Sequence, residues 1–111
     1  MKRLTLFTLA ALAVPVMVGA NSAAAHGVHL GAIFWAEEYC EGRPSVIADD
    51  LHMSYSDKSN PDKPDFESGA SNGYKVIGQL AAEVGIANTC AEIARRYGPN
   101  GVVHPKLWVG N

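Results

Sequence analysis

The sequence lacks most of the motifs that mark enzymes. Its 111 residues include only two cysteines, with no Cys-x-x-Cys pair and no glycine-rich phosphate loop. Glu37 and Glu41 lie one helical turn apart, but a pair of glutamates at this spacing is typical of a solvated surface. We therefore expect a protein that is not an enzyme.

An excess of basic residues is also missing. The chain has nine lysines and arginines against eleven aspartates and glutamates. Two of the basic residues, Lys2 and Arg3, belong to the N-terminal segment discussed next, and without that segment the net charge is −4. A negative domain is a poor partner for nucleic acid or an anionic membrane surface, so neither is expected to bind.

No apolar run is long enough to span a membrane. The longest run, residues 4–18, follows Lys2 and Arg3 and falls short of the roughly 20 residues that a bilayer requires. Three alanines at positions 23–25 then supply a small-residue cleavage site. This pattern predicts a secretory signal peptide, with an uncleaved anchor as the less favoured alternative.

We place the cleavage after Ala25, which makes residues 1–25 the signal peptide and residues 26–111 a single helical domain. Other positions also fit the small-residue requirement, namely cuts after Ala20, Ser22 and Ala24. The predicted location is the periplasm or the exterior of the cell, with no stable membrane anchor after cleavage.

Export gives the two cysteines a simple interpretation. In an oxidising compartment, Cys40 and Cys90 are expected to form one disulfide that closes a loop of about 50 residues. On the chain-entropy model such a loop stabilises the fold by roughly 4 kcal/mol. The alternative, a redox-active or metal-binding pair, is disfavoured because the cysteines are far apart in the sequence.

Apolar residues at three- and four-residue spacing predict a small all-α domain of four helices with an extended apolar C-terminal tail. The expected helices cover residues 30–40, 44–55, 64–84 and 89–97. Pro44 suits the first turn of the second helix. Thr89 and Glu92 have the spacing of a capping box at the start of the fourth, and Gly98 suits a left-handed residue at its end.

The third predicted helix contains three glycines, Gly69, Gly73 and Gly78, each of which weakens a helix by up to about 1 kcal/mol relative to alanine. They favour either close helix–helix packing or a groove floor that admits a ligand or partner. In the tail, Val103, Leu107 and Trp108 either cover the core or pair with another molecule. Gly69, Gly73 and Trp108 are therefore the candidate binding residues.

Two metals come into question. The polar loop around Asp57, Asn60 and Asp62 lacks the spacing and central glycine of a calcium-binding loop, so calcium is not expected. Cleavage after Ala25 would make His26 the first residue, whose amine and ring nitrogens can chelate copper, with His29 as a third donor. Further ligands are available at His52, Met53 and His104, but the sequence does not place them nearby.

Three short segments resemble the HdeA-type acid-stress chaperones of the bacterial periplasm: Tyr39-Cys40-Glu41, the run of residues 60–65, and Thr89-Cys90. Members of that family are small exported helical proteins with one disulfide of similar span. The resemblance implies a neutral-pH homodimer that opens in acid and holds unfolding client proteins on exposed apolar surface. The chain differs from the family in lacking a lysine-rich helical tail.

Together these observations predict a small exported protein that acts by binding a protein partner or client, in the manner of a periplasmic stress or chaperone-like protein. The alternative function is copper binding in the periplasm through His26 and His29. No other cofactor is expected.

Overall fold

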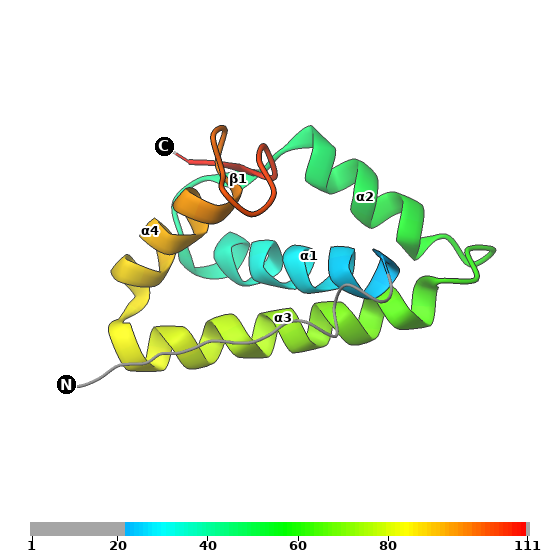
Figure 1. The fold of residues 1–111 in the computed structure, drawn as a ribbon, viewed down its shortest axis with the longest axis horizontal. Coiled ribbons are helices and arrows are strands. Elements are labelled where there is room, and N and C mark those ends of the chain that lie inside the picture. The colour runs from blue at the N-terminus through cyan, green and yellow to red at the C-terminus, as the bar shows by residue number, and fades with distance from the viewer. Residues whose placement is uncertain (1–21, 111) are drawn as a thin grey trace.

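The first helix, α1, is the central element of the fold. The computed structural model describes residues 22–110, so residues 1–21 of the predicted signal peptide lie outside the described part of the chain. The elements follow in the order α1 (Ser22–Tyr39), β1 (Arg43–Pro44), α2 (Val46–Ser56), α3 (Lys63–Val84), α4 (Ile86–Tyr97) and β2 (Trp108–Val109). Figure 1 shows α3 on one side of α1, and α2, α4 and the C-terminal segment on the other. The predicted all-α fold of four helices with a disulfide is confirmed.

Glycines hold α1 and α3 in close parallel contact. A Cβ atom added at Gly69 would lie 2.3 Å from the carbonyl oxygen of Ala24, and one at Gly73 would lie 2.1 Å from that of Val28. The contact is reciprocal, because Cβ atoms at Gly27 and Gly31 of α1 would each lie 2.2 Å from a carbonyl oxygen of α3. Small residues spaced four apart allow two helix backbones to approach this closely. Close packing is therefore the role that the structure gives Gly69 and Gly73.

This contact explains an error in the predicted helices. α1 begins at Ser22, eight residues before the predicted start at Leu30, because the glycine-rich stretch around Gly27 is stabilised by packing that propensity does not report. On α3, the two glycines of the contact lie between the buried side chains of Phe66 and Ile77.

The second helix begins after Pro44 rather than at it. Pro44 belongs to β1 and pairs with Trp108 of β2 in a short antiparallel ladder. Ser45 caps α2, since its side-chain oxygen accepts a hydrogen bond from the backbone N–H of Ala48 at 3.1 Å. Serine is a preferred N-cap residue, and a proline just before it ends the preceding extended segment.

The predicted capping box at Thr89 is wrong. α4 begins at Ile86, directly after Gly85, whose φ of 93° is in the region that favours glycine. Thr89 lies inside the helix, fully buried, and its hydroxyl donates to the carbonyl oxygen of Gly85 at 2.8 Å. The Glu92 carboxylate instead accepts from the guanidinium groups of Arg95 and Arg96.

The end of α4 and the tail also differ in part from expectation. Gly98 has φ −71° and ψ −170°, an extended conformation and not the predicted left-handed one. Leu107 and Trp108 are buried, so this part of the tail belongs to the core. Val103 is 47% exposed and does not cover the core as predicted. Residues 98–107 instead form an irregular segment that folds back over α1 and α4 (Figure 1).

The glycine contact makes a sharp prediction for α3. Gly73→Ala forces a methyl group onto the carbonyl oxygen of Val28 and should lower the free energy of unfolding by about 2 kcal/mol. Gly78→Ala is the matched control, because its nearest neighbour would be the Trp35 side chain at 3.9 Å. Alanine there should raise stability by up to about 1 kcal/mol through helix propensity. Urea unfolding measures both variants, and equal effects would contradict the packing account.

Candidate functional site

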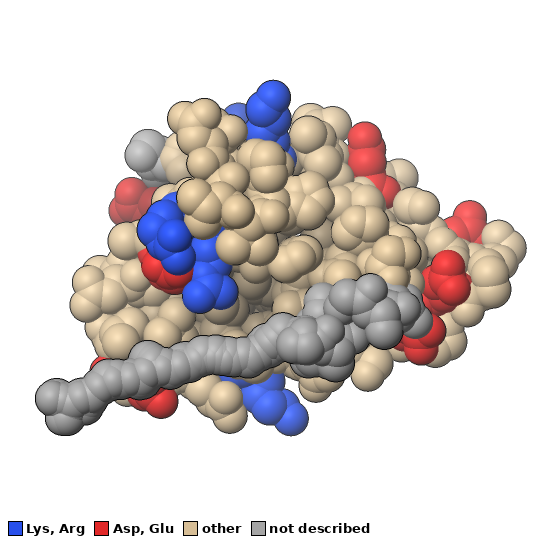
Figure 2. Space-filling model, viewed as in Figure 1, with Lys and Arg blue, Asp and Glu red and all other residues tan. Residues whose placement is uncertain are grey.

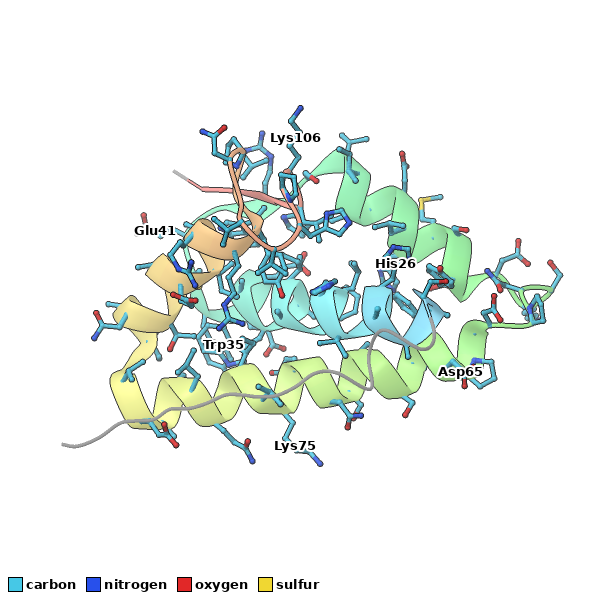
Figure 3. The ribbon with its side chains drawn as sticks, in the orientation of Figure 1. His26, Trp35, Glu41, Asp65, Lys75 and Lys106 are labelled. Carbon is cyan, nitrogen blue, oxygen red and sulfur yellow. A yellow bond between two sulfur atoms is a disulfide. The ribbon has the colours of Figure 1, made fainter. Side chains whose placement is uncertain are left out.

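Three histidines meet on the side of α1 that faces away from α3. His26 and His29 lie one turn apart on α1, and His104 comes from the segment of residues 98–107. The ring centroid of His104 is 6.2 Å from that of His26 and 6.0 Å from that of His29. Figure 3 shows His26 on the side of α1 towards α2. We call His26, His29 and His104 the histidine cluster.

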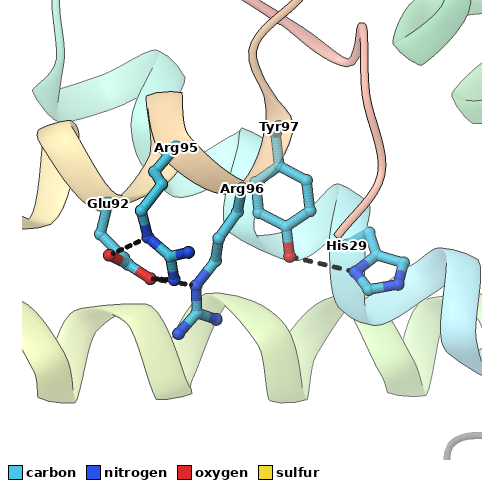
Figure 4. Close-up of polar contacts among 5 residues, drawn as sticks. All are labelled: His29, Glu92, Arg95, Arg96 and Tyr97. Atoms are coloured by element: carbon cyan, nitrogen blue, oxygen red, sulfur yellow. Dashed lines mark hydrogen bonds and ion pairs between the residues drawn. The ribbon is translucent and has the colours of Figure 1, made fainter. Parts of the chain in front are cut away.

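Two tyrosine hydroxyls hold the helical histidines in place. Nδ1 of His26 is 2.9 Å from the hydroxyl of Tyr55 on α2, and Nδ1 of His29 is 3.0 Å from the hydroxyl of Tyr97 on α4 (Figure 4). Burial raises the pKa of Tyr97, which keeps its hydroxyl protonated. The cluster therefore joins α1 to α2, to α4 and to the segment of residues 98–107.

The environment of the cluster favours neutral imidazoles. Burial, followed by the positive charges that His104, His26 and Arg96 can carry, lowers the pKa of His29 to about 4. The pKa of His26 is also lowered, by burial and by His104. Every charged neighbour that acts on these two rings is a cation or becomes one in acid.

Arg96 is fixed beside the cluster by an ion pair. Its Nε atom lies 2.6 Å from one carboxylate oxygen of Glu92. The other carboxylate oxygen accepts a hydrogen bond from Nε of Arg95 at 3.0 Å (Figure 4). The Arg95 hydrogen bond, followed by that of Arg96, lowers the pKa of the Glu92 carboxyl. Glu92 thus stays ionised into moderate acid and keeps Arg96 in place while the histidines titrate.

The cysteines form the predicted crosslink at the other end of α1. Cys40 and Cys90 are joined by a disulfide with an S–S distance of 2.07 Å and a Cα–Cα distance of 5.6 Å. This bond ties the end of α1 to α4, and it indicates a non-reducing compartment. Beside it lies a shallow depression of about 640 Å³, with Ile86, Cys90 and the edge of Trp108 in its wall.

The remaining candidate residues lie elsewhere. Gly69 and Gly73 are buried between α3 and α1, on the opposite side of α1 from the histidine cluster. Trp108 is buried apart from its edge. His52 is an exposed residue of α2 whose ring packs against Phe34, with a centroid separation of 4.8 Å, outside the histidine cluster.

Sequence reasoning found only part of this site. It named His26 and His29, but for copper chelation at a chain terminus, whereas both side chains project from the body of α1. Their i, i+3 spacing would have placed them on one face had the helix been extended back to Ser22. The contributions of His104, Tyr55 and Tyr97 depend on tertiary packing and left no signal in the sequence.

The described residues offer no ready-made metal site, because no three histidine, cysteine or carboxylate side chains stand close enough to share one ion. None of the described helices is long and apolar enough to cross a membrane. The face shown in Figure 2 is largely uncharged, with basic side chains over α4 and at the upper and lower edges, and acidic ones scattered towards the two ends.

Comparisons of the chain with protein-family models, with curated proteins and with solved structures gave no match. Functional inference therefore depends on the geometry of the site itself.

The lowered pKa of His29 predicts loss of stability in acid. The folded chain resists protonation of this ring, so the unfolded chain binds the proton first and folding weakens as the pH falls from about 6.5 to about 4. Since the ring is partly exposed, we discount the full effect of the shift to roughly 1–2 kcal/mol.

Thermal unfolding between pH 7 and pH 4 tests this expectation. His29→Gln should lose about 1–2 kcal/mol less than the wild-type protein over this range, because glutamine takes no proton there. His52→Gln removes an exposed histidine outside the cluster and should follow the wild type. An unchanged pH dependence in His29→Gln would contradict the role assigned to this ring.

Proposed function

We propose that the protein is a small, exported, non-enzymatic binding protein that acid converts from a closed to a client-binding form, in the manner of a periplasmic stress chaperone. The observation that carries this proposal is the histidine cluster. Two of its rings, His26 and His29, lie where burial and neighbouring cations disfavour their charged forms, so acid acts on the contacts that hold the fold together. The non-reducing compartment indicated by the disulfide supports an address outside the cytoplasm.

Protonation places several positive charges in one small volume. Charged His26 and His29 would each have a ring centroid about 6 Å from that of His104, and the guanidinium of Arg96 also acts on His29. The phenol groups of Tyr55 and Tyr97 can accept hydrogen bonds from the charged rings but supply no negative charge. Repulsion therefore acts to separate α1 from the segment of residues 98–107 and from the end of α4 that carries Arg96.

The two elements that cover the cluster also carry apolar side chains on their outer surface. On α2 these are Val46, Ile47 and Met53, and in the segment of residues 98–107 they are Val102 and Val103. If either element moved away from α1, apolar side chains of the core beneath would become exposed as well. Such a surface suits an unfolding client protein, which exposes apolar segments of its own.

The disulfide limits how far the protein opens. It lies at the C-terminal end of α1, next to the β1–β2 ladder, whereas the histidine cluster lies near the N-terminal end, about 15–20 Å away along the helix. Charge repulsion at one end therefore loosens residues 98–107 while the other end stays joined. We propose that this partial opening creates the client-binding state, together with separation of the dimer that the family resemblance implies.

A client-aggregation assay tests the function directly. The wild-type protein should suppress aggregation of an acid-sensitive client at about pH 3 and not at pH 7. The variant with His26→Gln, His29→Gln and His104→Gln should lose most of the acid-specific protection, and His52→Gln should keep it. Circular dichroism at pH 7 first establishes that each variant is folded. Absence of protection by the wild type, or full protection by the triple variant, would refute the proposal.

Copper binding is the second candidate, and a specific feature of the cluster favours it. When Nδ1 of His26 and His29 donates to the tyrosine hydroxyls, the opposite ring nitrogen, Nε2, is left as a metal donor. Burial keeps His26 and His29 neutral, as a metal ligand requires. The rings stand wider apart than three imidazoles on one ion, so binding requires His104 and its exposed segment to move inwards.

Calorimetric titration with Cu(II) at pH 7 examines this candidate. His104→Gln should weaken binding by at least about tenfold, because it removes one of three imidazole donors. His52→Gln should bind as the wild type does. If His104→Gln leaves the affinity unchanged, the cluster is not the copper site.

A further inference from the structure

The first turn of α1 is packed against the rest of the fold. α1 begins at Ser22, and Ala23, the second residue, is only 1% exposed. The next residue, Ala24, places its carbonyl oxygen against the backbone of Gly69 on α3. Residues 22–25 are thus a structural part of the domain, although the small-residue pattern alone places them inside a signal peptide.

Removal of these residues would undo a specific contact. Gly69 lacks a side chain at a point where a Cβ would lie 2.3 Å from the oxygen of Ala24, so its surface is shaped to receive that turn of α1. Without Ala24, the backbone of α3 at Gly69 would lose the turn of α1 that packs against it. The helix would then begin at His26 and Gly27, and glycine in a first turn gives little support to a helix end.

A chain that began at His26 would also carry a new charge at the wrong place. The α-amino group has an ordinary pKa of about 7.7–8.0 and is largely charged at neutral pH. The amine would lie beside the ring of His26, whose pKa is already lowered by His104. The His26–Tyr55 hydrogen bond, which joins α1 to α2, would then depend on a terminal residue that frays readily.

From these contacts we infer that the leader is removed after Ala20, so that the mature chain begins at Asn21 and keeps the whole of α1. The reaction is hydrolysis of the Ala20–Asn21 peptide bond by a leader peptidase. Water supplies the hydroxyl that makes Ala20 a carboxylate and the proton that makes Asn21 a free amine. The sequence meets the requirement for small residues before the cut with Ala20 and, two residues earlier, Val18.

Of the four small-residue cuts, this is the one that spares α1. A cut after Ser22, Ala24 or Ala25 removes one or more of its residues. Asparagine is also among the residue types preferred immediately before a helix, and the sequence has Asn21 there. This processing replaces the predicted boundary after Ala25, and it excludes copper chelation by a terminal amine on His26. Any metal at the cluster must use ring nitrogens alone.

Intact mass tests the inference on the full chain. The gene with its own leader and a C-terminal tag is expressed in a bacterium, and the exported product is analysed by mass spectrometry and N-terminal sequencing. The expected chain begins at Asn21. A product that begins at Ala23, Ala25 or His26, or one that retains the leader, would overturn the inference.

Two leader variants and a stability comparison complete the test. Ala20→Asp should block cleavage at this position, whereas Ala25→Asp should leave the mass at that of a chain beginning at Asn21, with the substitution included. Separately refolded chains that begin at Asn21 and at His26 are then compared. The shorter chain should unfold at least about 5 °C lower. Equal melting temperatures would show that residues 21–25 are dispensable, which contradicts the structural basis of the inference.

None of these outcomes depends on the proposed chaperone function. The aggregation assay measures client protection, whereas mass and melting temperature report only where the mature chain begins. A protein that begins at Asn21 but gives no protection would retain this inference and lose the other.

Discussion

The backbone contact between α1 and α3 is the constraint on which the remaining structure depends. Glycines on each helix let backbone carbonyl groups of the other helix pack directly against them. This contact fixes how α1 is rotated about its own axis and where it lies along α3. With that rotation set, Leu30 and Ile33 enter the core and the two histidines of α1 turn away from α3. The position of the histidine cluster is therefore a consequence of glycine packing on the opposite side of the same helix.

The cluster places titratable groups where a purely stabilising design would place apolar ones. The partly buried imidazoles of His26 and His29 have only tyrosine hydroxyls as hydrogen-bonding partners, and these are weak partners for a charged ring. The positively charged neighbours of His29 also oppose its protonation. At neutral pH the arrangement is satisfied, since neutral rings and hydroxyls pair without net charge. In acid it becomes unfavourable without any change in the surrounding packing. Local departures from a stable apolar core are most common at functional sites. Here protonation of the histidine rings is the change that makes the arrangement unfavourable.

The sequence predicted those features that depend on local patterns or on compartment, and missed those that depend on tertiary contact. Two cysteines and a predicted export signal were enough to predict the Cys40–Cys90 bond, and apolar spacing predicted four helices. The start of α1 was missed because Gly27 weakens a helix unless another backbone lies against it. Thr89 matched a capping box, yet the burial of its side chain inside α4 prevailed over that local preference. His104 is 75 residues from His29 in the sequence, and no periodicity connects them.

The crosslink and the histidine cluster lie at opposite ends of α1, and this separation decides which kind of opening acid can produce. A disulfide does not titrate, so the end of α1 near Cys40 stays attached to α4 when the histidines are protonated. The contacts that do titrate hold α2 and residues 98–107, which are anchored at their far ends and covered with exposed valines and methionine. Charge at the cluster therefore favours local release over complete unfolding, because the entropy gained by a crosslinked chain on unfolding is smaller. On the proposed function, a loosened, still tethered domain would keep its apolar surface available and would close again when the rings lose their protons.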